Sequence, residues 1–228
     1  MGRGIFITAT DTGAGKTYFT CLLGKRLRLD GLAVLPLKPV ESGCVRGKEG
    51  HPFPADAAAL RDAFAPGLPL SEVCLYPLSG ALSPHLASRM EGVSIDLQRI
   101  RQKVMEAVRS SDFLLIEGAG GITVEIRDGY SFADLARDLS LPVLIVAGNR
   151  LGVLNHLQLT LRYLESEGIP LFGVILNDLT PEFFPAREHN EAEIRRIAGE
   201  RYLGRVPHGA VFLPEEIYSR FCPGRRQI

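Results

Sequence analysis

The chain is organised around the segment Ala9-Thr10-Asp11-Thr12-Gly13-Ala14-Gly15-Lys16-Thr17. A short apolar run at 5–7 precedes it, and a segment with helical character at 18–29 follows it. A strand, a glycine-containing turn, Gly-Lys-Thr and a helix are the elements of a phosphate-binding loop, in that order. The match to the common pattern G-x-x-x-x-G-K-[ST] is incomplete, because Thr10 stands where that pattern has its first glycine. The alternative is a glycine-rich turn that carries an incidental exposed lysine.

These loop residues predict a site for ATP and Mg²⁺. Glycines let backbone N–H groups approach phosphate oxygens, and the N-terminus of the following helix adds unpaired N–H donors. Lys16 would reach the β- and γ-phosphates, and the hydroxyl of Thr17 would hold Mg²⁺. The predicted nucleotide-binding residues of the loop are Asp11, Thr12, Gly13, Ala14, Gly15, Lys16 and Thr17.

Length and composition are those of an ordinary globular protein. The chain has 228 residues, of which 46% are hydrophobic and 23% charged, and its 26 basic residues balance 26 acidic ones. We expect one α/β domain spanning residues 1–228, with no nucleic-acid and no membrane partner. No apolar run approaches the roughly 20 residues that span a bilayer, and no signal peptide precedes the first strand. The four cysteines are scattered without C-x-x-C spacing, so they indicate neither a zinc site nor a redox motif and favour a cytoplasmic protein.

A second anchor lies in the middle of the chain. Residues 113–116 form a continuous apolar run, typical of a strand buried on both faces of a parallel sheet. The run ends at Glu117 and the glycine-rich stretch 118–121. An acidic residue at the end of such a strand can help to hold Mg²⁺, and glycines allow the backbone to approach phosphate or substrate. The pattern is weak alone, but downstream of Gly-Lys-Thr it indicates the second half of a nucleotide site.

Strands and helices alternate along the rest of the chain. Further strands are expected at 32–37, 141–146, 171–176 and 203–206. Helices are expected at 56–64, 95–110, 130–138, 153–167 and 188–197, with one more opening at Ser83 as N-cap. Segment 46–54 is predicted to be a surface loop. The alternation predicts a single-domain, doubly wound, mostly parallel sheet of the P-loop NTPase type.

Several polar residues follow the predicted strands, at the edge where open α/β sheets bind ligands. Lys38 ends the second strand, which we expect beside the strand that carries the phosphate loop. Taken alone, Lys38 is a solvated loop lysine, and Asp56 is a favourable charge at a helix N-terminus. Asn177 follows the fifth strand and either reads a base edge with its amide or caps a turn. The residues alone leave both roles of Asn177 open.

In combination and order, the motifs resemble one family over nearly the whole chain: dethiobiotin synthetase, an ATP-dependent enzyme of biotin synthesis. The matching pieces are Thr10-Asp11-Thr12 with Gly15-Lys16-Thr17, Lys38-Pro39-Val40 with Ser42-Gly43, Asp56-Ala57, Ser83-Pro84-His85, Glu117-Gly118-Ala119-Gly120-Gly121, Leu151-Gly152 with Asn155-His156, and Asn177-Asp178. His85 is given no catalytic role, because a histidine at this position can simply pack under its helix.

The resemblance implies a specific reaction. The substrates would be 7,8-diaminononanoate, CO₂ and ATP. One amine takes up CO₂ to form a carbamate, and the carbamate attacks the γ-phosphate of MgATP to give a mixed carbamic–phosphoric anhydride. The second amine then closes the ureido ring and releases phosphate and dethiobiotin.

The resemblance also implies roles for individual residues. Lys16 and Lys38 would be the cations that screen the reacting anions, with Thr12 and Ser42 bonding carbamate and substrate. Mg²⁺ would be shared by Thr17, Asp56 and Glu117, and Asn177 would read adenine. The implied substrate-binding residues are Lys38, Ser42, Glu117, Gly118, Ala119, Gly120, Gly121, Leu151, Gly152 and Asn155. The family is typically a homodimer, which would bring the active site near the subunit boundary.

The chain departs from the family pattern at two places. The loop opens with Ala9 where relatives commonly carry glycine, so this alanine has to accept the backbone angles of that position. Region 180–192, which in relatives helps to hold the carboxylate tail of the substrate, is less familiar and receives no residue assignments.

Two rival functions use the same scaffold. A glutamine-dependent amidoligase needs a further glutamine-hydrolysing domain, for which 228 residues are too few. A partitioning or septum-site ATPase switch usually carries an extra lysine early in the loop, whereas here no loop lysine precedes Lys16. Such switches also use an amphipathic tail, and Pro223 and Gly224 disfavour a helix there.

Overall fold

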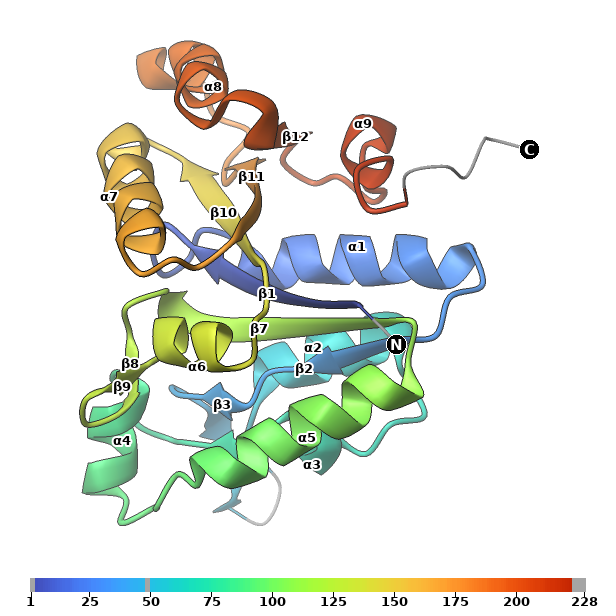
Figure 1. The fold of residues 1–228 in the computed structure, drawn as a ribbon, viewed down its shortest axis with the longest axis vertical. Coiled ribbons are helices and arrows are strands. Elements are labelled where there is room, and N and C mark those ends of the chain that lie inside the picture. Colours follow the sequence, from blue (N-terminus) through green and yellow to red (C-terminus); the bar gives the residue numbers. More distant parts are fainter. Residues whose placement is uncertain (1–2, 48–49, 223–228) are drawn as a thin grey trace.

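The centre of the fold is a six-stranded parallel sheet with the order β12–β11–β10–β1–β7–β2 (Figure 1). It is seen in a computed structural model that describes residues 3–47 and 50–222. The strands are β1 (Arg3–Ala9), β2 (Val34–Leu37), β7 (Phe113–Gly121), β10 (Val143–Asn149), β11 (Leu171–Asp178) and β12 (Tyr202–Val206). The parallel, doubly wound arrangement predicted from the alternating pattern is confirmed.

Helices cover both faces of this sheet (Figure 1). One apolar core joins the sheet to α1 (Lys16–Leu29), α2 (Ala55–Phe64) and α9 (Glu215–Tyr218). The other joins it to α5 (Leu97–Ser110), α6 (Phe132–Asp138), α7 (Val153–Ser166) and α8 (Pro185–Ala198). Within β1, Ile5 and Ile7 belong to the first core and Phe6 to the second. Because successive side chains of a strand point to opposite faces, a sheet covered on both faces requires the continuous apolar runs seen in the sequence.

Several short elements lie outside the central sheet, and most of them were not predicted. Three two-stranded pairs occur: β3 (Val40–Glu41) with β6 (Tyr76–Pro77), β4 (Val45–Arg46) with β5 (Pro52–Phe53), and β8 (Glu125–Arg127) with β9 (Tyr130–Ser131). The short helical elements without a prediction are α3 (Leu70–Val73) and the 3₁₀ turn Gly199–Arg201, whereas α4 (Pro84–Met90) confirms the helix expected to open at Ser83. The surface loop expected at 46–54 is therefore partly an antiparallel pair, and its residues 48–49 lie outside the described part of the chain. Strands this short carry no periodic signal of their own.

Several predicted boundaries are wrong by a few residues. Strand β7 does not end at Glu117 but continues to Gly121, with a bulge where Ile7 pairs with Glu117 and Ala9 with Gly121. Helix α8 begins at Pro185, since proline at the first helical position has no N–H to leave unsatisfied. The helix expected from residue 130 begins at 132, where the side chains and backbone of Ser131 and Asp134 form a capping box.

The expected neighbour of β1 is also wrong. Strand β2, which leads to Lys38, pairs with β7, and β1 lies between β7 and β10. Order along the chain does not fix order in a sheet, because helical crossovers can skip a position that a later strand fills. Lys38 therefore approaches the phosphate loop across the end of β7.

Ala9 needs no glycine-like backbone. Among the described residues, the only non-glycine with positive φ is Ser140, so neither Ala9 nor Thr10 lies in the left-handed region. The two substitutions in the loop pattern cause no backbone strain of that kind. Separately, no helix within 3–47 or 50–222 combines the length and apolar character needed to cross a membrane. The tail from Pro223 onward lies outside the described residues.

Candidate functional site

A cavity of about 690 Å³ opens at the carboxyl edge of the sheet, above the phosphate loop. Parallel α/β sheets place their ligand sites at this edge. The cavity is lined from four parts of the chain: the phosphate loop, the β2–α2 segment, the start of α4 and the end of β7 with the turn after it. The lining residues are Thr12, Gly13, Gly15, Lys16, Thr17, Lys38, Glu41, Ser42, Gly43, Asp56, Ala81, Leu82, Ser83, Pro84, Ala119, Gly120 and Val124.

The floor of the phosphate loop rests on Asn177. The Nδ2 of this asparagine, at the end of β11, donates a hydrogen bond to the carbonyl of Ala14 at 3.0 Å. Gly15 has a φ of 89°, and a Cβ there would lie 2.1 Å from Asn177 Nδ2. Only glycine fits this position, because it needs both positive φ and close approach to the amide. The Oδ1 of Asn177 is buried and has no hydrogen-bond partner among the described residues.

A buried charged centre lies beside the loop. Glu117 is fully buried, and its Oε1 accepts hydrogen bonds from Thr17 Oγ1 at 2.7 Å and from Lys38 Nζ at 2.6 Å. Lys38 Nζ also lies 3.0 Å from Asp56 Oδ2. Four parts of the chain, α1, the end of β2, α2 and β7, thus bring one hydroxyl, one ammonium and two carboxylates together. We call Thr17, Lys38, Asp56 and Glu117 the charged centre.

The two lysines respond differently to burial. Burial alone would lower the pKa of Lys38, but the carboxylates of Glu117 and Asp56 outweigh burial and raise that pKa above its usual value. Burial lowers the pKa of Lys16, against the opposing influence of Glu117, and the nearby Lys38 ammonium lowers it further. Lys38 is therefore firmly protonated, and Lys16 is a buried cation whose ionised form a phosphate group would stabilise.

The donor set fits a hard divalent cation. Thr17 and Lys38 both bond Glu117, and Asp56 faces Lys38, so oxygens of Thr17, Asp56 and Glu117 lie around one ammonium beside the cavity. Mg²⁺ prefers such oxygen ligands. Glu117 Oε2 is buried and has no hydrogen-bond partner in the described part of the chain. A buried carboxylate oxygen without a partner is costly, and coordination by a cation would satisfy it.

The structure brings some of the predicted site residues together and leaves others apart. Those on the cavity wall are Thr12, Gly13, Gly15, Lys16, Thr17, Lys38, Ser42, Asp56, Ala119 and Gly120. Those behind or beside the wall are Asp11, Ala14, Glu117, Gly118, Gly121 and Asn177. Leu151, Gly152 and Asn155 lie at the exposed start of α7, outside the cavity lining.

Two contacts near the site were missed from the sequence. Arg150, directly after β10, forms an ion pair with Asp11 of the loop. Glu41 on β3 accepts hydrogen bonds from the backbone at the start of α2. Arg150 and Glu41 both follow predicted strands, so their position in the sequence could have marked them as site candidates. Their partners could not be predicted, because these lie in other elements that come close only in the folded protein.

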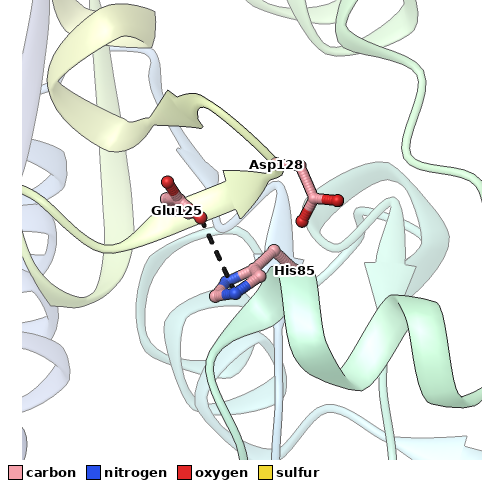
Figure 2. A group of neighbouring side chains, drawn as sticks. All are labelled: His85, Glu125 and Asp128. Atoms are coloured by element: carbon pink, nitrogen blue, oxygen red, sulfur yellow. Dashed lines mark ion pairs between the residues drawn. The ribbon is translucent and has the colours of Figure 1, made fainter.

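His85 belongs to a surface group at the rim of the cavity. Its Nε2 lies 3.6 Å from Glu125 Oε2 of β8, and Asp128 stands nearby (Figure 2). Potential ligand atoms of the three residues lie within 4.8 Å of one another. However, the carboxylate side chains are 40% and 74% exposed, and Asp128 also faces Arg89 at 3.8 Å. We regard the group as a solvated ion-pair cluster that links α4 to β8 when the imidazole is protonated.

Comparisons with known proteins identify the family of the chain. The family model described as an AAA domain matches residues 3–215. The ATP-dependent dethiobiotin synthetase BioD of Anaeromyxobacter dehalogenans (strain 2CP-C) is 39% identical over 205 residues, covering 90% of each chain. The protein of the same name from Aromatoleum aromaticum is 40% identical over 217 residues, covering 94% of this chain and 95% of the relative.

Solved structures add information on the fold alone. A ParA family ATPase from Chlorobium tepidum TLS has a TM-score of 0.56 and 16% identity, covering 98% of this chain and 94% of the other. The septum site-determining protein MinD in complex with Mg-ADP from Pyrococcus horikoshii OT3 has a TM-score of 0.54 and 19% identity, covering 96% and 86%. These identities are too low to favour the partitioning or septum-site function over the one named for the much more similar relatives. The chain is a member of the ATP-dependent dethiobiotin synthetase family.

Proposed function

We propose that this chain acts in the cytoplasm as a Mg²⁺-dependent dethiobiotin synthetase that joins 7,8-diaminononanoate and CO₂ at the expense of ATP. The observation that carries the proposal is the charged centre beside the phosphate loop. It combines a protonated lysine with oxygen ligands for a divalent cation. It lies at the wall of a cavity that is large enough for the triphosphate group of ATP and a small diamine. A reaction between a carbamate and a triphosphate needs both kinds of positive charge, because two anions must meet.

The reaction balances in three steps. An amine of the substrate adds to CO₂ and loses a proton, which gives a carbamate. A carbamate oxygen attacks the γ-phosphorus, the bond to ADP breaks, and a carbamic–phosphoric anhydride forms. The second amine attacks the carbamate carbon and loses a proton, and phosphate leaves with the oxygen that had bridged carbon and phosphorus.

Residues of the loop and the charged centre receive the nucleotide in this scheme. Lys16 pairs with the β- and γ-phosphates, which keep its buried ammonium charged. Thr17, Asp56 and Glu117 would hold Mg²⁺, which would supply positive charge against the negative charge of the reacting phosphate. Lys38, already beside both carboxylates, faces the cavity and stabilises the carbamate as it attacks.

The remaining roles concern positioning. Thr12 and Ser42 on the cavity wall bond the carbamate and substrate, and backbone N–H groups of 118–121 approach the anhydride. Asn177 contacts adenine in this proposal only through Oδ1, which suits the amino group of the base, because its Nδ2 already bonds Ala14. Since Oδ1 is buried, this contact requires a local shift of the loop or of the amide.

We also propose a homodimer with the site near its boundary. Leu151, at the start of α7, is 85% exposed, and Leu159 on the same helix is 58% exposed. Large exposed apolar side chains favour an interface, and Arg150 links this corner to Asp11 of the phosphate loop. Light scattering of the purified protein should give twice the mass of the chain, whereas Leu151→Asp should shift the mass toward the monomer.

The experiment for the proposed activity is a product assay. Purified protein is incubated with 7,8-diaminononanoate, bicarbonate and MgATP, and dethiobiotin and ADP are quantified by mass spectrometry. The proposal predicts equal amounts of both products, and no dethiobiotin when bicarbonate, ATP or Mg²⁺ is omitted. ATP hydrolysis without dethiobiotin in the complete mixture would contradict it.

A further inference from the structure

The first turn of α2 has no cap of its own. Helix N-termini leave backbone N–H groups without intrahelical partners, and a side chain at the N-cap position usually satisfies some of them. In α2 the N-cap residue is Pro54, and no side chain at that position makes a capping bond. Asp56 and Ala57, in the first turn, therefore need acceptors from elsewhere.

Glu41 supplies both acceptors from a different element. Its Oε1 accepts from the N–H of Asp56 at 2.9 Å, and its Oε2 accepts from the N–H of Ala57 at 2.9 Å. The glutamate is 5% exposed, and β3, which carries it, is paired to β6. The carboxylate also lies at the positive end of the helix dipole, where a negative charge is favoured. This two-oxygen contact ties the start of α2 to a rigid part of the cavity wall.

The anchored residue is the one whose side chain enters the charged centre. Asp56 Oδ2 lies 3.0 Å from Lys38 Nζ, but the Asp56 side chain is 50% exposed, so packing alone does not fix its position. Its backbone N–H, in contrast, is held by a buried carboxylate. The hydrogen bond from the Asp56 backbone to Glu41 thus orients the half-exposed Asp56 carboxylate toward the charged centre.

We propose that Glu41 is a positioning residue for the metal site: by capping α2 it sets the placement of Asp56 and thereby the affinity for Mg²⁺. This inference rests on the proposed role of Asp56 as a metal ligand. The proposal gives Glu41 no contact with the metal, because each of its oxygens accepts a hydrogen bond from a backbone N–H group of α2. Partners that orient a metal ligand commonly change metal affinity when they are removed.

The test measures metal binding directly. Mn²⁺, which takes the same oxygen ligands as Mg²⁺ and is visible by electron paramagnetic resonance, is titrated into protein saturated with a non-hydrolysable ATP analogue. Glu41→Gln keeps the side-chain shape but places an amide N–H₂ against a backbone N–H. We expect it to raise the Mn²⁺ dissociation constant by about 10-fold. Glu41→Ala should raise it at least as much, and Glu41→Asp, which keeps the charge, should raise it less.

A matched control separates positioning from general loss of a helix cap. Asp96 caps α5 by accepting from the N–H groups of Gln98 and Arg99, and it does not line the cavity. Asp96→Ala should lower the unfolding temperature much as Glu41→Ala does but leave the Mn²⁺ dissociation constant unchanged. If Asp96→Ala weakened Mn²⁺ binding as much as Glu41→Ala, the positioning role would be refuted.

The Asp56→Asn variant tests the metal-ligand role of Asp56 separately from the positioning role of Glu41. If Asp56→Asn weakens Mn²⁺ binding while all Glu41 variants bind like the unmodified protein, Glu41 has no positioning role but the metal site stands. If Asp56→Asn leaves Mn²⁺ binding unchanged, the metal assignment itself is wrong, and the inference falls with it.

Discussion

Two buried acidic residues at the ends of parallel strands have very different surroundings. Glu117 ends the apolar part of β7 and is fully buried, and Asp178 ends β11 and is 4% exposed. Glu117 keeps one oxygen without a partner among the described residues, and the groups on its other oxygen, Thr17 and Lys38, line the cavity.

Asp178, in contrast, is saturated by protein groups. Its Oδ1 accepts from Asn149 Nδ2 at 2.7 Å, and its Oδ2 accepts from Arg187 at 3.0 Å and from Arg205 at 2.8 Å. Asn149 is in turn bonded by Asn190 of α8. A carboxylate surrounded in this way holds elements together, whereas one with a spare buried oxygen beside a cavity is available to a ligand. The two roles differ in whether both carboxylate oxygens have partners within the protein, and not in how deeply the side chain is buried.

The largest effect is expected at the phosphate loop next to Glu117. Lys16→Ala should reduce dethiobiotin formation on the order of 10³-fold, because the phosphates lose their nearest fixed cation. Lys25→Ala, an exposed lysine on the same helix, is the control and should remain fully active. A folded Lys16→Ala protein with normal turnover at ordinary ATP concentration would show that the loop does not bind the nucleotide as proposed.

Lys38→Gln should have the next largest effect and should act on turnover rather than on nucleotide binding. The change keeps length and hydrogen bonding but removes the charge. We expect product formation to fall by about 10²-fold, as for loss of one group that stabilises a transition state. Titration with ATP should give a Kd close to that of the unmodified protein. A large loss of ATP affinity with normal turnover at saturating ATP would move Lys38 to the nucleotide site.

In contrast to changes at Lys16 and Lys38, changes at Asp178 should lower the stability of the fold and leave the rate of product formation nearly unchanged. Asp178→Asn leaves two arginines without their shared carboxylate, and both remain partly exposed, so we expect a loss of about 2 kcal/mol in the free energy of unfolding. The rate at saturating substrates should change little. Urea unfolding and the product assay on the same preparation provide the check, and a stable but inactive Asp178→Asn protein would remove the distinction between the two acids.

The smallest expected effect is a pH dependence of the unfolding free energy that is lost in Asp178→Asn. Burial raises the pKa of Asp178, but hydrogen bonds from Arg205, Asn149 and Arg187 outweigh burial, so the pKa is lower than usual. A depressed folded pKa adds stability above the unfolded value of about 3.9, and this stability disappears as pH falls through the folded pKa. The stability gap between the unmodified protein and Asp178→Asn should therefore be constant above about pH 5 and narrow below about pH 4. A gap that widened toward low pH would contradict the assignment.

The sequence predicts the layers of the fold well because its strands are buried on both faces. Runs such as 113–116 and 143–146 are typical of strands in a parallel sheet that is covered on both faces. The order of the strands within the sheet was harder to predict from the sequence. Lys38 was expected beside the loop strand, yet β7, which comes later in the chain, lies between β1 and β2. Such an insertion leaves no mark on local patterns.

For the candidate site, the sequence indicates which residues end strands but not what they contact. Glu117 and Asp178 have similar local patterns, because each comes within two residues of the end of an apolar run. Their difference depends on Arg187, Arg205 and Asn149 in one case and on Thr17 and Lys38 in the other, and most of these partners are distant in the chain. The cap that Glu41 places on α2 was missed for the same reason.

If the cavity brings a carbamate to the γ-phosphate of ATP, one oxygen atom of bicarbonate must end up in the released phosphate. In a rapid single turnover with ¹⁸O-labelled bicarbonate, 7,8-diaminononanoate and MgATP, the released phosphate is analysed by mass spectrometry. We expect phosphate that carries one ¹⁸O atom, because the oxygen bridging carbon and phosphorus leaves with phosphate on ring closure. Phosphate without label, formed together with dethiobiotin under conditions where bicarbonate keeps its label, would contradict attack of the carbamate on ATP.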